Sequence, residues 1–91
     1  MWIGHRLDAH GDAVGKIASV LGDGESPEWL VVRTGRLGKL TAVPGADAVE
    51  GVDCVWVPLP RDLVKSAPRI GAADQLDAAG ERRLREHYGI G

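Results

Sequence analysis

The stretch Glu-Trp-Leu-Val-Val-Arg-Thr, residues 28–34, is the strongest strand candidate in the chain. Its valines, leucine and tryptophan favour a pleated strand, in which successive side chains point to opposite faces. Leu30 and Val32 therefore share one face, and Trp29 and Val31 share the other. Because both faces are apolar, both need cover. One cover is the interior of the domain, and the other comes from the C-terminal tail or from a second protein chain.

Residues 52–57 repeat this two-faced pattern. The side chains of Val52, Cys54 and Trp56 lie on one side, and those of Val55 and Val57 lie on the other. This second strand therefore poses the same question of what covers its outer face.

Further short strands are expected over residues 4–7, 15–21 and 39–43, with a hairpin loop over 8–12 in which Gly11 takes a positive φ. Clusters of glycine and proline end these strands. Short strands at even spacing, without long helices between them, predict an all-β domain built as a small, partly open antiparallel barrel or meander.

Residues 77–88 are expected to form the one clear helix, with Asp77 as its N-cap and Gly89 as its left-handed C-terminal cap. Leu84 and Tyr88 lie on one stripe of this helix. A helix of three turns with a glycine inside it is marginal alone, so it should dock on another surface. The expected organisation is a barrel over residues 1–70 and a C-terminal tail over residues 71–91 that packs on the barrel or on a partner chain.

The composition fits one soluble domain of 91 residues with a net charge of −2, which creates no overall positive field. Cys54 is the only cysteine, so no internal disulfide forms and a reducing compartment is expected. The longest apolar run, residues 29–32, is far too short to span a bilayer, and no apolar leader follows Met1. We therefore expect a cytoplasmic protein without membrane insertion.

A set of short motifs spread along almost the whole chain resembles the bacterial PRC-barrel domain family, and within it the small stress-associated members of actinobacteria. The motifs are Gly15-Lys16-Ile17, Pro27-Glu28-Trp29, Val32-Arg33-Thr34-Gly35, Val43-Pro44, Val55-Trp56-Val57-Pro58, Asp62-Leu63-Val64-Lys65, Ala67-Pro68-Arg69-Ile70 and His87-Tyr88-Gly89. The same barrel occurs in the cytoplasmic domain of the photosynthetic reaction-centre H subunit and in the C-terminal half of a ribosome maturation factor.

The resemblance implies a PRC-type β-barrel that binds other macromolecules without catalysis, and several members of the family pair as dimers. The chain departs from the family pattern at several places, one of which is Gly45, where relatives usually carry an apolar residue. Relatives commonly carry polar residues at the positions of Cys54 and Trp56, and they begin the last helix with a Ser-Pro-Glu run in place of residues 77–80.

The main hypothesis is therefore a protein-interaction module that forms a homodimer and binds a cytoplasmic protein partner. The interface is expected to use the apolar outer positions, with Trp56 as its anchor, since tryptophan is enriched at binding hot spots. These positions are Trp29, Val31, Val52, Cys54, Trp56, Leu84 and Tyr88. The alternative for this face is that the chain's own tail covers it.

The second hypothesis is a module that associates with RNA or the ribosome through the basic corner Arg33, Arg36 and Lys39. These cations have no aromatic residues between them, acidic residues lie nearby, and the whole chain is acidic. A solvated strand end explains them better, so nucleic acid is the less favoured partner.

The sequence gives no sign of catalysis, a metal site or a cofactor. His5, His10 and His87 lack the spacing of metal ligands, and Cys54 has no histidine at a motif spacing. A small ligand in the barrel mouth is the least favoured function, because side chains fill barrels this narrow.

Overall fold

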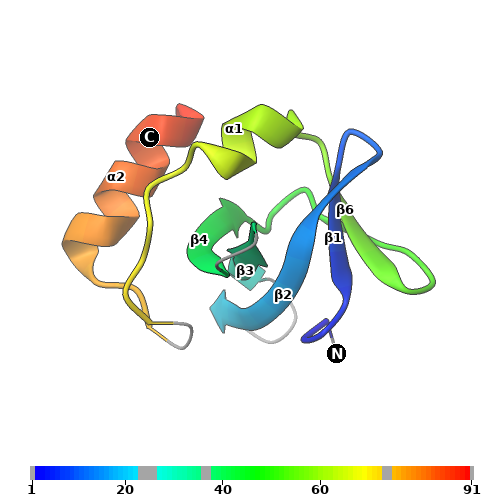
Figure 1. The fold of residues 1–91 in the computed structure, drawn as a ribbon. Helices are drawn as coiled ribbons and strands as arrows, with labels where there is room; N and C mark the ends of the chain where they lie inside the picture. Colours follow the sequence, from blue (N-terminus) through cyan, green and yellow to red (C-terminus); the bar gives the residue numbers. More distant parts are fainter. Residues whose placement is uncertain (1, 23–26, 36–37, 73–74, 91) are drawn as a thin grey trace.

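Six strands and two helices make up the computed structural model, which describes residues 2–22, 27–35, 38–72 and 75–90 (Figure 1). In chain order they are β1 (Arg6–Ala9), β2 (Asp12–Gly22), β3 (Pro27–Thr34), β4 (Lys39–Pro44), β5 (Val49–Glu50), β6 (Cys54–Val57), α1 (Arg61–Lys65) and α2 (Ala78–Tyr88). The domain is mainly β, as the strand pattern predicts.

The strands form one open sheet in the order β4-β3-β2-β1-β6-β5, so β4 and β5 are its edges. Strands β1 to β4 are an antiparallel meander, but β6 runs parallel to β1. The prediction of a wholly antiparallel arrangement is therefore wrong at this pair. The β5–β6 hairpin follows β4 in the chain yet adds to the free edge of β1 on the far side of the meander.

The first hairpin is tighter than predicted. Ala9 pairs with Asp12, so the loop is only His10 and Gly11, whose φ angles are 49° and 86°. Two positive φ values are the signature of the turn that suits the right-handed twist of a hairpin. The expected positive φ at Gly11 is confirmed, whereas the longer loop over residues 8–12 is wrong.

Strand β3 separates two apolar cores, as its two-faced sequence requires. Leu30 and Val32 belong to the inner core, together with residues of β1, β2, β6 and α1. Trp29 and Val31 belong to the outer core, together with residues of β4 and of the C-terminal arm, a name used here for residues 66–90. Both sides of β3 are therefore covered within one chain.

Helix α1 was not predicted from the sequence. It has five residues and no side-chain cap, and Pro60 precedes it. Its Val64 is fully buried in the inner core, so tertiary packing holds this short helix against the sheet.

Helix α2 has the expected caps. The Asp77 side chain accepts a hydrogen bond from the Gly80 amide at 2.6 Å, and Gly89 has a φ of 71°. On the buried side, Leu84 is fully enclosed in the outer core. The helix therefore docks on the sheet of its own chain.

The C-terminal arm also covers the free edge of β4. The Ile70 amide donates to the Leu40 carbonyl oxygen at 2.9 Å, and the Tyr88 hydroxyl donates to the Ala42 carbonyl oxygen at 2.9 Å. Thr41 Oγ1 donates to the Pro68 carbonyl oxygen at 2.8 Å. Bare strand edges invite pairing with other chains, and here the arm occupies that position.

Candidate functional site

The outer face of the sheet is covered on one half and open on the other. Over β3 and β4, the arm buries Trp29, Val31 and Ala42. Helix α2 lies on this side, away from β1 and β6 (Figure 1). The same face continues across β1, β6 and β5, where no described helix lies over it.

The uncovered half carries a small apolar surface, which we call the open patch: Val49, Val52, Cys54 and Trp56. Trp56 is 38% exposed and stands directly opposite Val49, which is 55% exposed. Val52, in the turn between β5 and β6, is 93% exposed. Cys54 is half-buried and lies on the same face as Trp56. The predicted anchor at position 56 is thus accessible, and the arm does not cover it.

An ion pair borders the open patch. Asp8 and Arg6 on β1 stand opposite Trp56 and Cys54, respectively. Arg6 Nε and one terminal nitrogen donate to the two carboxylate oxygens of Asp8, at 2.7 and 3.0 Å. The hydrogen bond to Asp8 and its negative charge raise the pKa of the Arg6 guanidinium. This two-point contact fixes both charges beside the indole.

The structure places the other predicted interface residues inside the chain. Trp29, Val31 and Leu84 are buried together, and the half-buried Tyr88 packs against them. Of the two covers that the sequence leaves open for β3, a tail or a second chain, the structure has the tail. These residues therefore offer no surface to a partner in this arrangement.

The predicted basic corner is reorganised. Arg36 lies outside the described residues. Lys39 is tied to the arm, because its Nζ donates to the Lys65 and Ala67 carbonyl oxygens at 3.1 and 2.8 Å. Arg33 and Lys39 instead line a pocket with Arg69 of the arm. Sequence reasoning missed Arg69 because nothing local signals that the arm passes beside β4.

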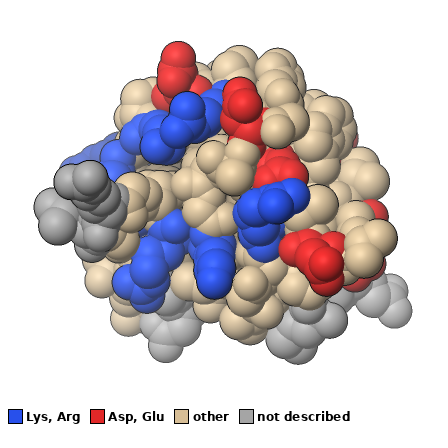
Figure 2. Space-filling model, turned by 45° about the vertical axis from the view of Figure 1, so that its right-hand side comes forward, with Lys and Arg blue, Asp and Glu red and all other residues tan. Residues whose placement is uncertain are grey.

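Charges are unevenly distributed around the open patch. Lys16 on β2 stands directly opposite Arg33 on β3 and Arg6 on β1, which makes a row of cations across three strands. Exposed acidic residues lie in the loops beside β5 and β6 on the other side: Asp47 and Asp53. Figure 2 shows Lys and Arg mainly over the left and lower parts of the visible face and Asp and Glu along its top and right, where one basic group lies between acidic ones.

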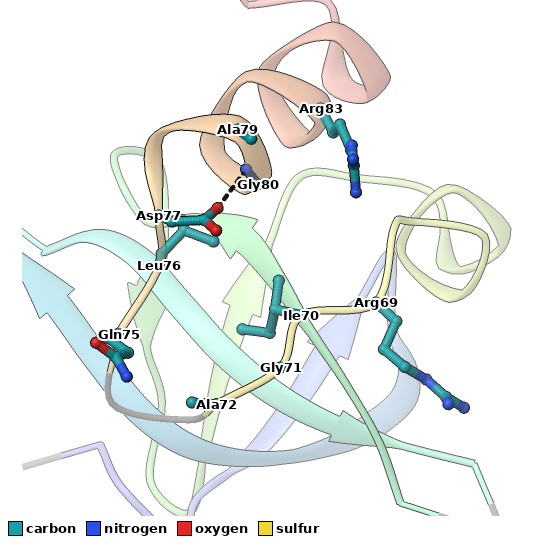
Figure 3. Close-up of a pocket in the computed structure, with 10 residues that line it drawn as sticks. All are labelled: Arg69, Ile70, Gly71, Ala72, Gln75, Leu76, Asp77, Ala79, Gly80 and Arg83. Atoms are coloured by element: carbon teal, nitrogen blue, oxygen red, sulfur yellow. Dashed lines mark hydrogen bonds between the residues drawn. The ribbon is translucent and has the colours of Figure 1, made fainter.

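A cavity of about 610 Å³ lies between residues 69–72 of the arm and the start of α2 (Figure 3). Arg83 extends from α2 toward Ile70, whereas Arg69 extends away from the other lining side chains. The one carboxylate in the lining, Asp77, already accepts the hydrogen bond of Gly80. The described lining therefore places no reactive pair of side chains together.

One serine and one histidine approach each other outside this cavity. Ser66 Oγ lies 3.5 Å from His87 Nε2, but that nitrogen is only 2.7 Å from the Leu63 carbonyl oxygen. At that distance Nε2 carries the proton and donates to the carbonyl. It therefore has no lone pair with which to activate Ser66, and the contact is structural. Among the described residues, no three metal-binding side chains come together.

The sequence matches no model of a known protein family, and it matches no curated protein. In the described part of the chain, neither helix has the length and apolar character needed to cross a bilayer. The candidate site therefore depends on the geometry of this chain alone.

Proposed function

We propose that the chain is a non-enzymatic protein-interaction module of the PRC-barrel type, and that its first partner is a second copy of itself. The homodimer would form through the open patch, and the assembled surface would bind a cytoplasmic protein. The motifs that resemble the PRC-barrel family support the barrel assignment, as do the strongly curved sheet and the docked C-terminal helix (Figure 1).

The observation that carries the proposal is the unequal covering of one sheet face. The arm buries the β3–β4 half and leaves Trp56 and Val49 exposed side by side on the other half. Clustered exposed apolar side chains of this kind mark interaction surfaces. Burial of the rest of the Trp56 indole and its neighbours contributes about 2–3 kcal/mol per chain to the association.

Charge complementarity favours a second copy as the occupant. The cation Lys16 lies on the β2 side of the open patch, and the exposed carboxylates Asp47 and Asp53 lie in the loops on the β5–β6 side. A two-fold axis that runs along the strands, between two facing sheets, brings the basic side of each copy over the acidic side of the other. Such an interface is self-complementary, which a symmetric dimer requires.

The test is sedimentation equilibrium of the wild type, Trp56→Arg and the control Ile90→Arg. Ile90 has the same exposed fraction as Trp56, 38%, but follows α2 at the opposite end of the molecule (Figure 1). We expect dimers for the wild type and Ile90→Arg, and a folded monomer for Trp56→Arg. If Trp56→Arg is unfolded by circular dichroism, Val49→Arg serves the same purpose, because Val49 is more exposed and its replacement disturbs less packing.

A monomeric wild type at high protein concentration contradicts the proposal. So does a folded Trp56→Arg or Val49→Arg variant that dimerises as tightly as the wild type.

A further inference from the structure

A second pocket lies where β3, β4 and the arm meet, and we propose that it binds the phosphate group of a phosphomonoester. Its volume is about 340 Å³. The described residues that line it are Arg33, Gly38, Lys39, Leu40, Arg69 and Ile70. Three of the six are cations and none is acidic, so the pocket has the charge that selects an anion.

Lys39 is held in place without being neutralised. Its ammonium donates to two main-chain carbonyl oxygens, Lys65 O at the end of α1 and Ala67 O in the arm. An ammonium has three N–H donors, so one remains for a ligand. Carbonyl oxygens carry no net charge, so the positive charge of Lys39 stays beside the pocket that this residue lines.

Arg33 is positioned by Gly38. A Cβ built on Gly38, whose φ is +67°, would stand 3.2 Å from both Cγ and Cδ of Arg33, so the arginine stem lies across the glycine. The absence of a side chain there lets the guanidinium reach the pocket.

Within the described part of the chain, Arg33, Lys39 and Arg69 form no ion pair with a carboxylate. Cations gathered around one pocket repel each other, and a bound anion relieves this repulsion. The pocket thus gains stability from a ligand rather than from its own residues.

Phosphate fits the donor set better than a carboxylate does. A phosphomonoester offers three strong acceptor oxygens and nearly two negative charges. Arginine binds such a group through two parallel hydrogen bonds, and lysine binds it as a point charge. The pocket is larger than a phosphate alone, and Leu40 and Ile70 provide an apolar wall for the organic group that carries it.

The test is a titration of the isotopically labelled full-length chain followed by amide chemical shifts. The probes are inorganic phosphate, adenosine monophosphate, adenosine, and a short RNA with or without a 5′-phosphate. We expect the phosphorylated probes to shift the amides of Gly38, Leu40 and Ile70, and adenosine to leave them in place. Arg33→Gln and Arg69→Gln should each weaken binding about tenfold, as the loss of one charged two-point contact predicts. Arg82→Gln, which removes an exposed arginine of α2 outside the pocket, should bind like the wild type.

The probes also separate the sources of the phosphate. Equal affinity for adenosine monophosphate and the 5′-phosphorylated RNA identifies a small phosphorylated ligand. Tighter binding of the phosphorylated RNA identifies an RNA end. The proposal is overturned if no phosphorylated probe shifts these amides, if Arg82→Gln weakens binding as much as Arg33→Gln, or if RNA binds equally well without its phosphate. Trp56→Arg should leave phosphate binding unchanged, so failure here is distinct from failure of the dimer proposal.

Discussion

The phenol of Tyr88 joins two layers of the molecule through one side chain. It lies between α2 and β4, packs against both apolar cores and donates to the Ala42 carbonyl oxygen at 2.9 Å. Burial raises the pKa of this phenol well above its ordinary value of 10.0, because a phenolate there would lose its hydration. The protonated side chain is therefore part of the folded state.

Alkaline pH should destabilise the protein through Tyr88. The unfolded phenol ionises near its ordinary pKa of about 10, whereas the folded phenol stays protonated. The folded state then holds more protons, so stability falls as the pH rises above that value. Urea denaturation across this range should show the loss in the wild type and less of it in Tyr88→Phe. At neutral pH, Tyr88→Phe should be less stable by about 1 kcal/mol, the usual value of one hydrogen bond.

Tyr88 is the only tyrosine in the chain, so phenolate absorbance reports its titration directly. A folded protein whose phenol titrates at its ordinary pKa contradicts the prediction.

Trp29 and Trp56 show that residue patterns predict the sheet face on which a side chain lies but not what covers it. Alternation along each strand places both indoles on the outer side, and the structure confirms both placements. The pattern does not say what lies above them. The cover over Trp29 comes from residues about 40–55 positions further along the chain, such as Ile70 and Leu84, and no local signal encodes that contact. The contacts of Lys39 could not be predicted for the same reason. Its ammonium reaches the Lys65 and Ala67 carbonyl oxygens, which only the tertiary fold brings near it.

At the scale of elements, β2 has one irregularity in its pairing with β1 and two in its pairing with β3, and Gly15 lies beside the one with β1. A Cβ on Gly15 would overlap the main-chain carbonyl oxygen of Arg33 on the adjacent strand. A carbonyl within a strand cannot move away without breaking the ladder. The close approach of β2 and β3 therefore requires glycine at this position.

Gly15→Ala should destabilise the protein by about 3 kcal/mol, the upper range for overpacking. Gly71→Ala is the matched control, because a Cβ there meets no atom within 4 Å and its φ is not positive. The two variants are compared by their urea midpoints. Equal stability of Gly15→Ala and Gly71→Ala would show that the strands are not this close.

The elements were predictable where their own residues determine them. The caps of α2 follow from Asp77 and Gly89, and the meander follows from its turns. Helix α1 was not predictable, since five residues after a proline are too few to show the apolar periodicity that distinguishes a helix from a loop. The parallel direction of β6 was also missed, because alternation of side chains is identical in parallel and antiparallel strands.

At the scale of the whole molecule, the two cores belong to one cooperative unit. Strand β3 contributes to both, and Tyr88 contacts both. The arm is attached to the sheet by Leu84 and Ile70 in the outer core and by the hydrogen bonds along β4. Loss of the arm contacts should therefore lower the stability of the sheet as well.

Leu84→Ala should reduce the free energy of unfolding by about 3 kcal/mol through a cavity in the outer core. The control Arg82→Ala changes an exposed residue of the same helix and should have little effect. Far-ultraviolet circular dichroism and tryptophan fluorescence should give coincident urea transitions for both variants. Separate transitions would mean that α2 unfolds independently of the sheet, against this expectation.

The parallel pair and the covered β4 edge also affect how the chain is made. During synthesis the meander of β1 to β4 emerges first. At that stage β1 lacks its neighbour β6, and the outward carbonyls of Leu40 and Ala42 lack their donors, Ile70 and Tyr88. Until these contacts form, two nascent copies on one messenger can pair through these bare strands. Docking of Ile70 and Tyr88 onto β4 ends that exposure, so the C-terminal arm protects this strand edge against pairing with another copy.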